Sequence, residues 1–207
     1  MEIIDLGLID YAQAAQVQAG RCRDVCGSGR DECLIFCRHH PVITIGRSGS
    51  PANITASPES LRQKEIAVVR SPRGGDVTYH GPGQVMIYPI LRLSRFALDL
   101  HRYLRFLEEA VIAVLAGCGI RAHQRPGLTG IWVGERKISS IGIRVQHWVS
   151  SHGIAVNVLQ DDLVNFSCIR PCGMDIAMTS VETVTNVPWE PAIIQDRMAR
   201  RLQSCIQ

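Results

Sequence analysis

The clearest periodic pattern of hydrophobic positions lies in residues 99–116. Leu100, Leu104, Leu107 and Val111 recur at the spacing that places side chains on one face of an α-helix. Gly117 follows this pattern, and glycine commonly ends helices. We therefore predict a helix from Asp99 to Ala116.

Shorter patterns predict the other elements. Apolar runs bounded by glycine, proline or polar turn residues are typical of β-strands, and they occupy residues 3–8, 33–38, 42–46, 66–70, 85–93, 130–133, 137–145 and 149–158. Further helices are expected at residues 10–26, 57–64 and 191–206. Strands and helices do not alternate as regular βαβ units. We therefore expect an α+β fold with mixed or antiparallel sheets and helices.

The composition favours one folded domain. The chain has 207 residues, 46% hydrophobic and 20% charged, which suits a single domain spanning residues 1–207. A formal net charge of +3 is too small to indicate nucleic-acid binding. No apolar run has the length of a membrane span, and the first residues do not resemble a signal peptide. We expect a cytoplasmic, monomeric enzyme that binds neither nucleic acid nor membrane.

A glycine-rich segment follows the strand predicted at residues 66–70. Residues 73–84 are Arg-Gly-Gly-Asp-Val-Thr-Tyr-His-Gly-Pro-Gly-Gln, and such glycines let a ligand approach main-chain N–H groups closely. Thr78 and His80 would face one side of an extended chain. The segment lacks the Gly-Lys-Ser/Thr of a P-loop and the helix of a dinucleotide site. Taken alone, it fits a ligand-binding loop and an ordinary mobile loop equally well.

The strand predicted at residues 137–145 begins with a lysine. Strict alternation places Lys137 on the same face as Ile141 and Ile143, at the polar end of a stripe that becomes buried. This lysine either borders a functional site or is an ordinary solvated residue at a strand end.

Cys172 stands between Pro171 and Gly173, which indicates a turn with an accessible thiol. A thiol reacts as its thiolate, and a nearby cation lowers its pKa. Lys137 and His80 are the candidates for that role, and Cys168 competes with Cys172 as the nucleophile. A spectator thiol is the alternative explanation.

The chain has eight cysteines, and without an export signal we expect reduced thiols. Cys22 and Cys26 share a face of the first helix, and Cys33 and Cys37 share a face of a strand. Packing explains both pairs, and their spacing does not favour a metal site. The methionines at 86, 174 and 178 are also interpreted as packing residues.

In combination, these segments resemble the lipoyl(octanoyl) transferase family, whose members begin protein lipoylation. The shared pattern is Arg-Gly-Gly-x-x-Thr-aromatic-His-x-Pro-Gly-Gln, then Lys-Ile-x-x-Ile-Gly, then Pro-Cys-Gly, and it occurs here at residues 73–84, 137–142 and 171–173. The likeness extends from about residue 5 to residue 185 and includes the His-Pro-Val-Ile-Thr-Ile-Gly-Arg of residues 40–47.

The resemblance implies a biotin/lipoate protein ligase-like fold. It implies that Cys172 is the nucleophile and that Lys137 lowers its pKa and transfers protons. The substrate-binding residues that it implies are Arg73, Gly74, Gly75, Asp76, Val77, Thr78, Tyr79, His80, Ser140, Ile141, Gly142, Gly153, Ile154 and Ala155. Ile141, Ile143 and Ile154 would line a channel for the acyl chain.

The implied reaction moves octanoyl, or lipoyl, from acyl carrier protein to a lysine of a lipoyl domain through an S-acyl-cysteine. Octanoyl-acyl carrier protein would be the donor, and the acceptors would be lipoyl-domain proteins such as H protein and 2-oxoacid dehydrogenase E2 subunits. Neither a cofactor nor a metal is implied.

One departure from the family pattern is Asp76, where Gln or Glu is expected. Its charge would weaken thiol activation if it faced Lys137. Two alternatives stay open: an ATP-dependent lipoate or biotin protein ligase of the same fold, and a non-catalytic thiol or metal-binding protein.

Overall fold

Two sheets organise the chain in the computed structural model, which describes residues 1–27, 31–171 and 174–206. The larger sheet has the strand order β1-β2-β6-β10-β9-β8-β7, and the smaller has the order β4-β3-β5. In each sheet one pair is parallel, β1 with β2 and β3 with β4, and the other pairs are antiparallel. The predicted α+β fold with mixed sheets is confirmed.

The strands are β1 (Glu2–Ile9), β2 (Cys33–His39), β3 (Val42–Ile45), β4 (Ala67–Arg70), β5 (Val77–His80), β6 (Gln84–Ile90), β7 (His123–Arg125), β8 (Leu128–Val133), β9 (Arg136–Gln146) and β10 (Val149–Asn157). The α-helices are α1 (Tyr11–Gly27), α2 (Pro58–Gln63), α3 (Leu100–Ala116), α4 (Val181–Thr185) and α5 (Pro191–Ile206). Short 3₁₀ helices span Pro51–Asn53, Leu93–Phe96 and Asp161–Cys168.

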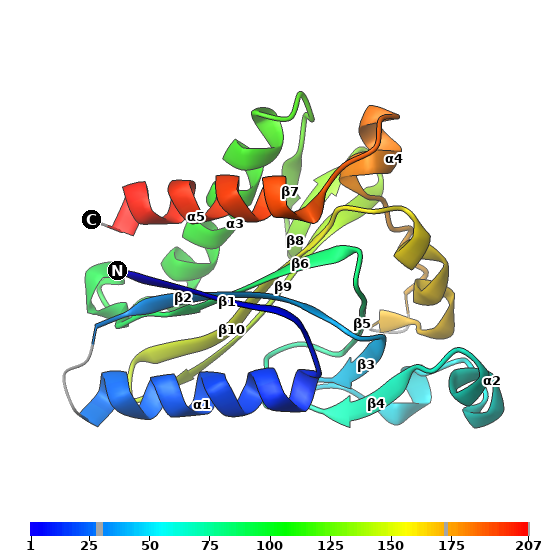
Figure 1. Cartoon of the computed structure of the whole chain (residues 1–207), viewed down its shortest axis with the longest axis horizontal. Helices are drawn as coiled ribbons and strands as arrows, with labels where there is room; N and C mark the ends of the chain where they lie inside the picture. The colour runs from blue at the N-terminus through cyan, green and yellow to red at the C-terminus, as the bar shows by residue number, and fades with distance from the viewer. Residues whose placement is uncertain (28–30, 172–173, 207) are drawn as a thin grey trace.

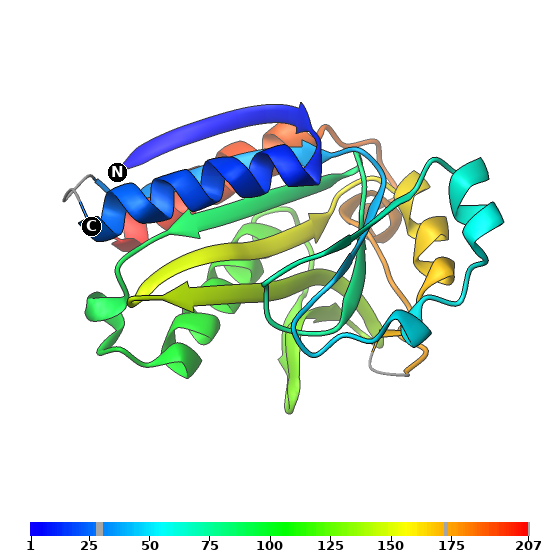
Figure 2. The same ribbon diagram turned by 90° about the horizontal axis from the view of Figure 1, so that it is seen from below.

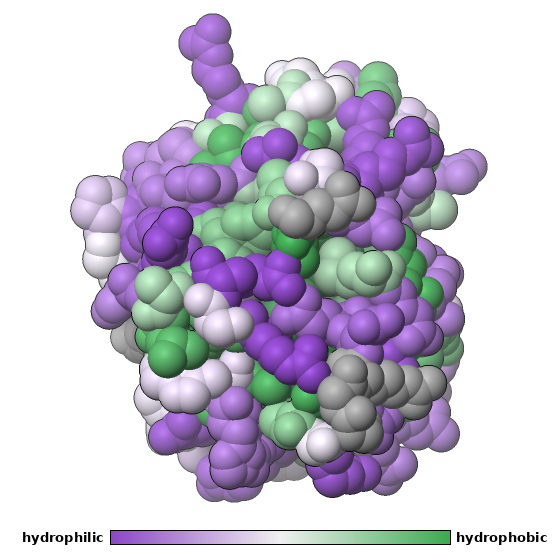
Figure 3. Space-filling model, turned by 90° about the vertical axis from the view of Figure 1, so that its left-hand side faces the viewer, coloured by the Kyte–Doolittle hydropathy of each residue, from purple (hydrophilic) through white to green (hydrophobic). Residues whose placement is uncertain are grey.

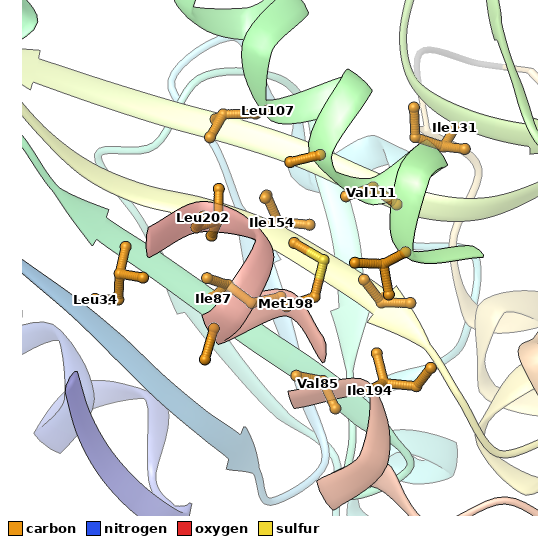
Figure 4. Close-up of a cluster of buried hydrophobic side chains, with 14 of the residues drawn as sticks. Leu34, Val85, Ile87, Leu107, Val111, Ile131, Ile154, Ile194, Met198 and Leu202 are labelled. Atoms are coloured by element: carbon orange, nitrogen blue, oxygen red, sulfur yellow. The ribbon is translucent and has the colours of Figure 1, made fainter. Parts of the chain in front are cut away.

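Helices cover both faces of the larger sheet (Figure 1). On one face, α3 and α5 supply Leu107, Val111 and Met198 to a buried cluster that also contains Ile87 and Ile154 of the sheet (Figure 4). On the other face lies α1, and the smaller sheet packs beside the end of the larger one (Figure 2). This three-layer arrangement buries the strongly apolar stripe that the sequence of α3 predicts.

Three of the four cysteines in α1 and β2 are packing residues. Cys33 and Cys37 have no exposed surface and lie in the cluster under α1, and Cys22 packs against it. Cys26 is exposed, so its predicted packing role is wrong. The seven cysteines in the described part of the chain are free thiols, as expected.

Besides the short 3₁₀ helices, two strands and one α-helix of the described structure have no counterpart in the predictions from the sequence. Strand β5 lies inside the glycine-rich segment and pairs with β3. Strand β7 is only three residues long, and α4 is a single short helix capped by Ser180. Each is too short to show a repeating hydrophobic pattern, so tertiary contacts decide its conformation.

The end of the molecule that carries both termini is mostly hydrophilic, with small hydrophobic groups between the polar side chains (Figure 3). Within the described residues, no helix combines the length and the apolar character that crossing a bilayer requires.

The start of α3 provides a test of this fold. The Asp99 side chain accepts hydrogen bonds from the main-chain N–H groups of His101 and Arg102 at 2.8 and 3.2 Å. Asp99→Ala should lower the free energy of unfolding by about 1 kcal/mol, the usual worth of such a cap. Urea denaturation measures the change, with the exposed Glu109→Ala of the same helix as the control. Equal stability of the two variants would contradict the capping role.

Candidate functional site

A cavity of about 310 Å³ lies between the two sheets. Its walls come from the glycine-rich segment and β5, from the first half of β9, from β10, and from the chain on either side of residues 172–173. The predicted site residues that line it are Arg73, Gly74, Gly75, Asp76, Val77, Thr78, His80, Lys137, Ser140, Ile141, Gly142, Gly153 and Ala155. Segments that are more than one hundred positions apart in the sequence, such as those of Arg73 and Met178, therefore converge on one space.

Two predicted substrate-binding residues lie outside this lining. Tyr79 is fully buried on β5, and its hydroxyl donates a hydrogen bond to Asp162 at 3.2 Å. Ile154 packs into the cluster under α3 and α5. Both follow from strand alternation, because Thr78 and His80, and Gly153 and Ala155, point the other way. The geometry therefore indicates that neither Tyr79 nor Ile154 contacts an acyl chain in this cavity.

Arg73 uses its charge to hold the loop rather than to face a ligand. Its Nη2 donates to the main-chain oxygens of Thr44 and Asp76, both at 2.7 Å, and its Nε donates to the Thr44 hydroxyl at 2.9 Å. Burial lowers the pKa of this guanidinium. Because most of its N–H groups are satisfied within the protein, the cavity wall is less polar than the sequence suggests.

Asp76 is likewise turned into its own chain. Its carboxylate accepts hydrogen bonds from the main-chain N–H of Ser50 at 3.1 Å and from the Asn53 amide at 2.5 Å. These contacts tie the glycine-rich loop to residues 46–53. The negative charge of Asp76, which would weaken thiol activation if it faced Lys137, is thus directed at this neighbouring loop.

Lys137 reaches the cavity through an irregularity in the sheet. The pairing of β8 with β9 shifts register between Ile131 and Trp132, which breaks the alternation assumed from the sequence. Lys137 consequently lines the cavity together with Gly142, whereas Ile143 packs against the large core. The prediction that Lys137 and Ile143 share a face is wrong, and so is a role for Ile143 in the cavity wall.

The chain after residue 173 pairs directly with Lys137. The main-chain N–H of Lys137 donates to Ala177 at 2.8 Å, and the Lys137 carbonyl accepts from Thr179 at 2.9 Å. Pro171 and Met174 both line the cavity, and the Met174 N–H donates to the Pro171 carbonyl at 3.0 Å. Cys172, the predicted nucleophile, lies outside the described residues, and its flanks border the same space as Lys137.

The competing candidates for the reactive pair are placed elsewhere or stay uncharged. Cys168 is buried in the cluster around the smaller sheet, with Sγ 3.9 Å from Lys64 Nζ, and does not line the cavity. Burial lowers the pKa of His80 to about 3, so its imidazole is neutral at physiological pH and cannot stabilise a thiolate by charge. Lys137 is the candidate cation that remains.

His80 is held in one tautomer. Its Nδ1 lies 3.0 Å from Gln84 Oε1, while Gln84 Nε2 donates to Tyr79 O and Asn157 Oδ1. The amide oxygen is therefore the acceptor, and His80 carries its proton on Nδ1.

Neutral polar side chains form one end of the cavity. The Tyr11 hydroxyl lies 2.6 Å from Ser71 Oγ and 3.4 Å from His152 Nδ1, and Tyr88 completes the group. Burial lowers the pKa of His152 to about 4 and raises the pKa values of Tyr11 and Tyr88. These groups are thus all uncharged near neutral pH, which suits an uncharged ligand.

Several lining residues were not predicted as site residues: Tyr11, Met86, Tyr88, Trp132, His152, Phe166, Met174 and Met178. The methionines at 86, 174 and 178 were assigned to packing, and all three border the cavity. None of the motifs described in the sequence analysis contains these residues.

No three metal-binding side chains come together within the part of the chain that the structure describes.

A protein-family model and several known proteins match this chain. The lipoyl protein ligase A/B catalytic domain matches residues 10–203. An octanoyltransferase of Geobacter sp. (strain M21) is 48% identical over 86% of this chain and 83% of its own length. An octanoyltransferase of Syntrophotalea carbinolica is 42% identical over 100% of this chain and 95% of its own length.

Solved structures share the fold at much lower identity. A lipoate-protein ligase A bound with ATP matches with a TM-score of 0.77 and 16% identity, over 99% of this chain and 85% of its own. A biotin protein ligase from Aquifex aeolicus matches with a TM-score of 0.57 and 14% identity, over 99% of this chain and 68% of its own. The expected biotin/lipoate protein ligase-like fold is confirmed.

The two cavity histidines make stability depend on pH. The unfolded chain binds their protons near pH 6.5, whereas the folded protein binds them only near pH 3 for His80 and pH 4 for His152. The free energy of unfolding should therefore fall as the pH drops below about 6.5, by about 2 kcal/mol per histidine at pH 5.

Urea denaturation at pH 7 and pH 5 tests this for the wild type and His152→Gln. The variant should lose about 2 kcal/mol less than the wild type between the two pH values. The same loss in both proteins would show that His152 does not carry this proton linkage.

Proposed function

This chain belongs to the lipoyl protein ligase A/B catalytic domain family, and within it we propose that the chain is an octanoyltransferase that acts through an S-acyl-cysteine. The observation that carries the mechanism is the main-chain pairing of Lys137 with Ala177 and Thr179. It supports the assignment of Cys172 as nucleophile and Lys137 as its activating residue, because the chain that carries the thiol returns to the lysine at the cavity.

In the first half-reaction, the Cys172 thiolate attacks the carbonyl carbon of an octanoyl thioester on acyl carrier protein. The bond from that carbon to the carrier sulfur breaks, and the carrier thiolate takes a proton from the Lys137 ammonium. Before the attack, the same ammonium lowers the pKa of Cys172 by charge. The products are S-octanoyl-Cys172, a neutral Lys137 and the free carrier thiol.

In the second half-reaction, a neutral lysine amine of a lipoyl domain attacks the thioester carbon. Lys137 accepts the proton that the amine loses, and Cys172 leaves as the thiolate. The enzyme returns to its starting protonation state. A thioester is converted to an amide, which is downhill, so the cycle needs no ATP.

The cavity suits the acyl chain. Apart from Lys137, its ionisable groups are neutral or hydrogen-bonded within the protein, as described for His80, His152 and Arg73. Each methylene that leaves water for such a site contributes about 0.8 kcal/mol. Ile141 and Met86 add apolar surface to the walls.

The partners follow from the same proposal. Octanoyl-acyl carrier protein is the donor, and lipoyl-domain proteins such as H protein and 2-oxoacid dehydrogenase E2 subunits are the acceptors. As expected from the sequence analysis, we propose that the enzyme is a monomer and acts in the cytoplasm.

An ATP-dependent lipoate or biotin ligase is the second candidate, since solved structures with this fold include such ligases. Those matches are 14–16% identical and support the fold alone. A ligase would activate a free acid and would not need Cys172. The octanoyltransferases at 42–48% identity favour transfer from a thioester.

Intact-protein mass spectrometry tests the proposal after incubation with octanoyl-acyl carrier protein in the absence of ATP. We expect one octanoyl adduct, labile to hydroxylamine, on the wild type and on the matched control Cys168→Ser. Cys172→Ser should carry none, and Lys137→Met should be acylated at least tenfold more slowly, because less thiolate is present.

Absence of an adduct from all the proteins, together with ATP-dependent transfer of free lipoate, would replace the transferase with a ligase. An adduct that persists in Cys172→Ser would instead move the nucleophile to another residue.

A further inference from the structure

Glu108 is a charged residue without exposed surface, in the middle of α3. Its Oε2 pairs with Arg105 Nη1 at 2.5 Å, and the Arg105 side chain is 47% exposed. A carboxylate in such a place is costly unless both of its oxygens accept hydrogen bonds. The group that binds the second carboxylate oxygen, Oε1, therefore indicates the role of this buried charge.

That partner is the main chain of β8. Glu108 Oε1 accepts a hydrogen bond from the N–H of Gly130 at 3.0 Å. Gly130 has a φ of +122°, a conformation that other residues rarely adopt. It directly precedes the register shift between β8 and β9 at Ile131 and Trp132. A side-chain carboxylate thus fixes the strand where its regular pairing is disturbed.

Lys137 lies against this same glycine. A Cβ atom at Gly130 would stand 2.4 Å from Lys137 Cε and 3.1 Å from Lys137 Nζ. The lysine side chain therefore occupies the space that any other residue at position 130 would fill. The position of Gly130 decides where the end of the lysine side chain rests.

The aromatic neighbour of the ammonium, Trp132, restrains its position less tightly than Gly130 does. Lys137 Nζ is 5.6 Å from the centroid of the Trp132 ring, and the guanidinium of Arg125 lies 4.5 Å from the same ring. A cation–π contact of this kind tolerates lateral movement, and a lysine side chain is flexible. Of these two contacts, the one with Gly130 is the tighter restraint.

We propose that Glu108 is a positioning residue for Lys137, acting through Gly130. Its carboxylate holds the Gly130 main chain in the one place that leaves room for the lysine, and so sets the distance from the ammonium to the reacting thiol. The inference rests on the role that the proposed function gives to Lys137 and Cys172. It assigns Glu108 a part in the reaction although it lies on a core helix outside the cavity lining.

The test measures how fast iodoacetamide alkylates Cys172 between pH 5 and pH 10, by mass spectrometry of the peptide that contains it. Glu108→Ala should raise the apparent pKa of this thiol by about one unit, and so slow its alkylation at neutral pH about tenfold. Glu108→Gln keeps an acceptor for the Gly130 N–H and should stay within about threefold of the wild type. Glu109→Ala, the exposed neighbour on the same helix, is the matched control.

A second comparison separates positioning from general damage. In a Lys137→Met background the thiol has lost its cation, so adding Glu108→Ala should change the pH profile no further. A shift of the same size with and without Lys137 would overturn the proposal. A wild-type profile in Glu108→Ala would also overturn it.

The same data distinguish this proposal from the proposed function. If the profiles behave as expected but octanoyl is not transferred, the positioning role stands and the octanoyltransferase assignment fails. If the wild-type thiol has an ordinary pKa that Lys137→Met leaves unchanged, both the activation by Lys137 and its positioning by Glu108 are refuted.

Discussion

The main-chain pairing between Lys137 and residues 177–179 is the contact on which the site depends. It joins the start of β9, in the interior of the larger sheet, to the chain that follows Cys172. Without it, the lysine and the chain after residue 173 would belong to separate parts of the surface. With it, Lys137, Pro171 and Met174 border one cavity. Helix α3 packs on β9 and helps to hold this part of the sheet in place.

Most ionisable side chains in the cavity wall are either hydrogen-bonded within the protein or uncharged. Arg73 and Asp76 are charged, yet each is satisfied by hydrogen bonds to neighbouring loops. His80 and His152 are neutral because burial disfavours their protonated forms. An apolar acyl chain can enter without leaving an unpaired charge behind. In the proposed mechanism, the positive charge that acts in the chemistry is that of Lys137, which lines this cavity.

Much of this was predictable from the sequence, and the exceptions have physical causes. Long periodic stretches such as residues 99–116 identified their helices and strands, and the family resemblance carried by three motifs led to the proposed pair of Lys137 and Cys172. The face of Lys137 was not predictable, because a register shift opposite Ile131 and Trp132 breaks the alternation of β9. Tyr88 reaches the cavity through the order of strands in the sheet, and Tyr11 through the packing of α1 on that sheet, and no local pattern records either.

The central claim is that the cavity holds the acyl chain while it is bonded to Cys172. A crystal structure of the protein after reaction with an octanoyl thioester tests it most directly. The account predicts continuous density from Cys172 Sγ, past Lys137, into the space bounded by Thr78, His80 and Gly142. An octanoyl group bonded to another residue, or one that extends from Cys172 over the outer surface with the cavity empty, would contradict it.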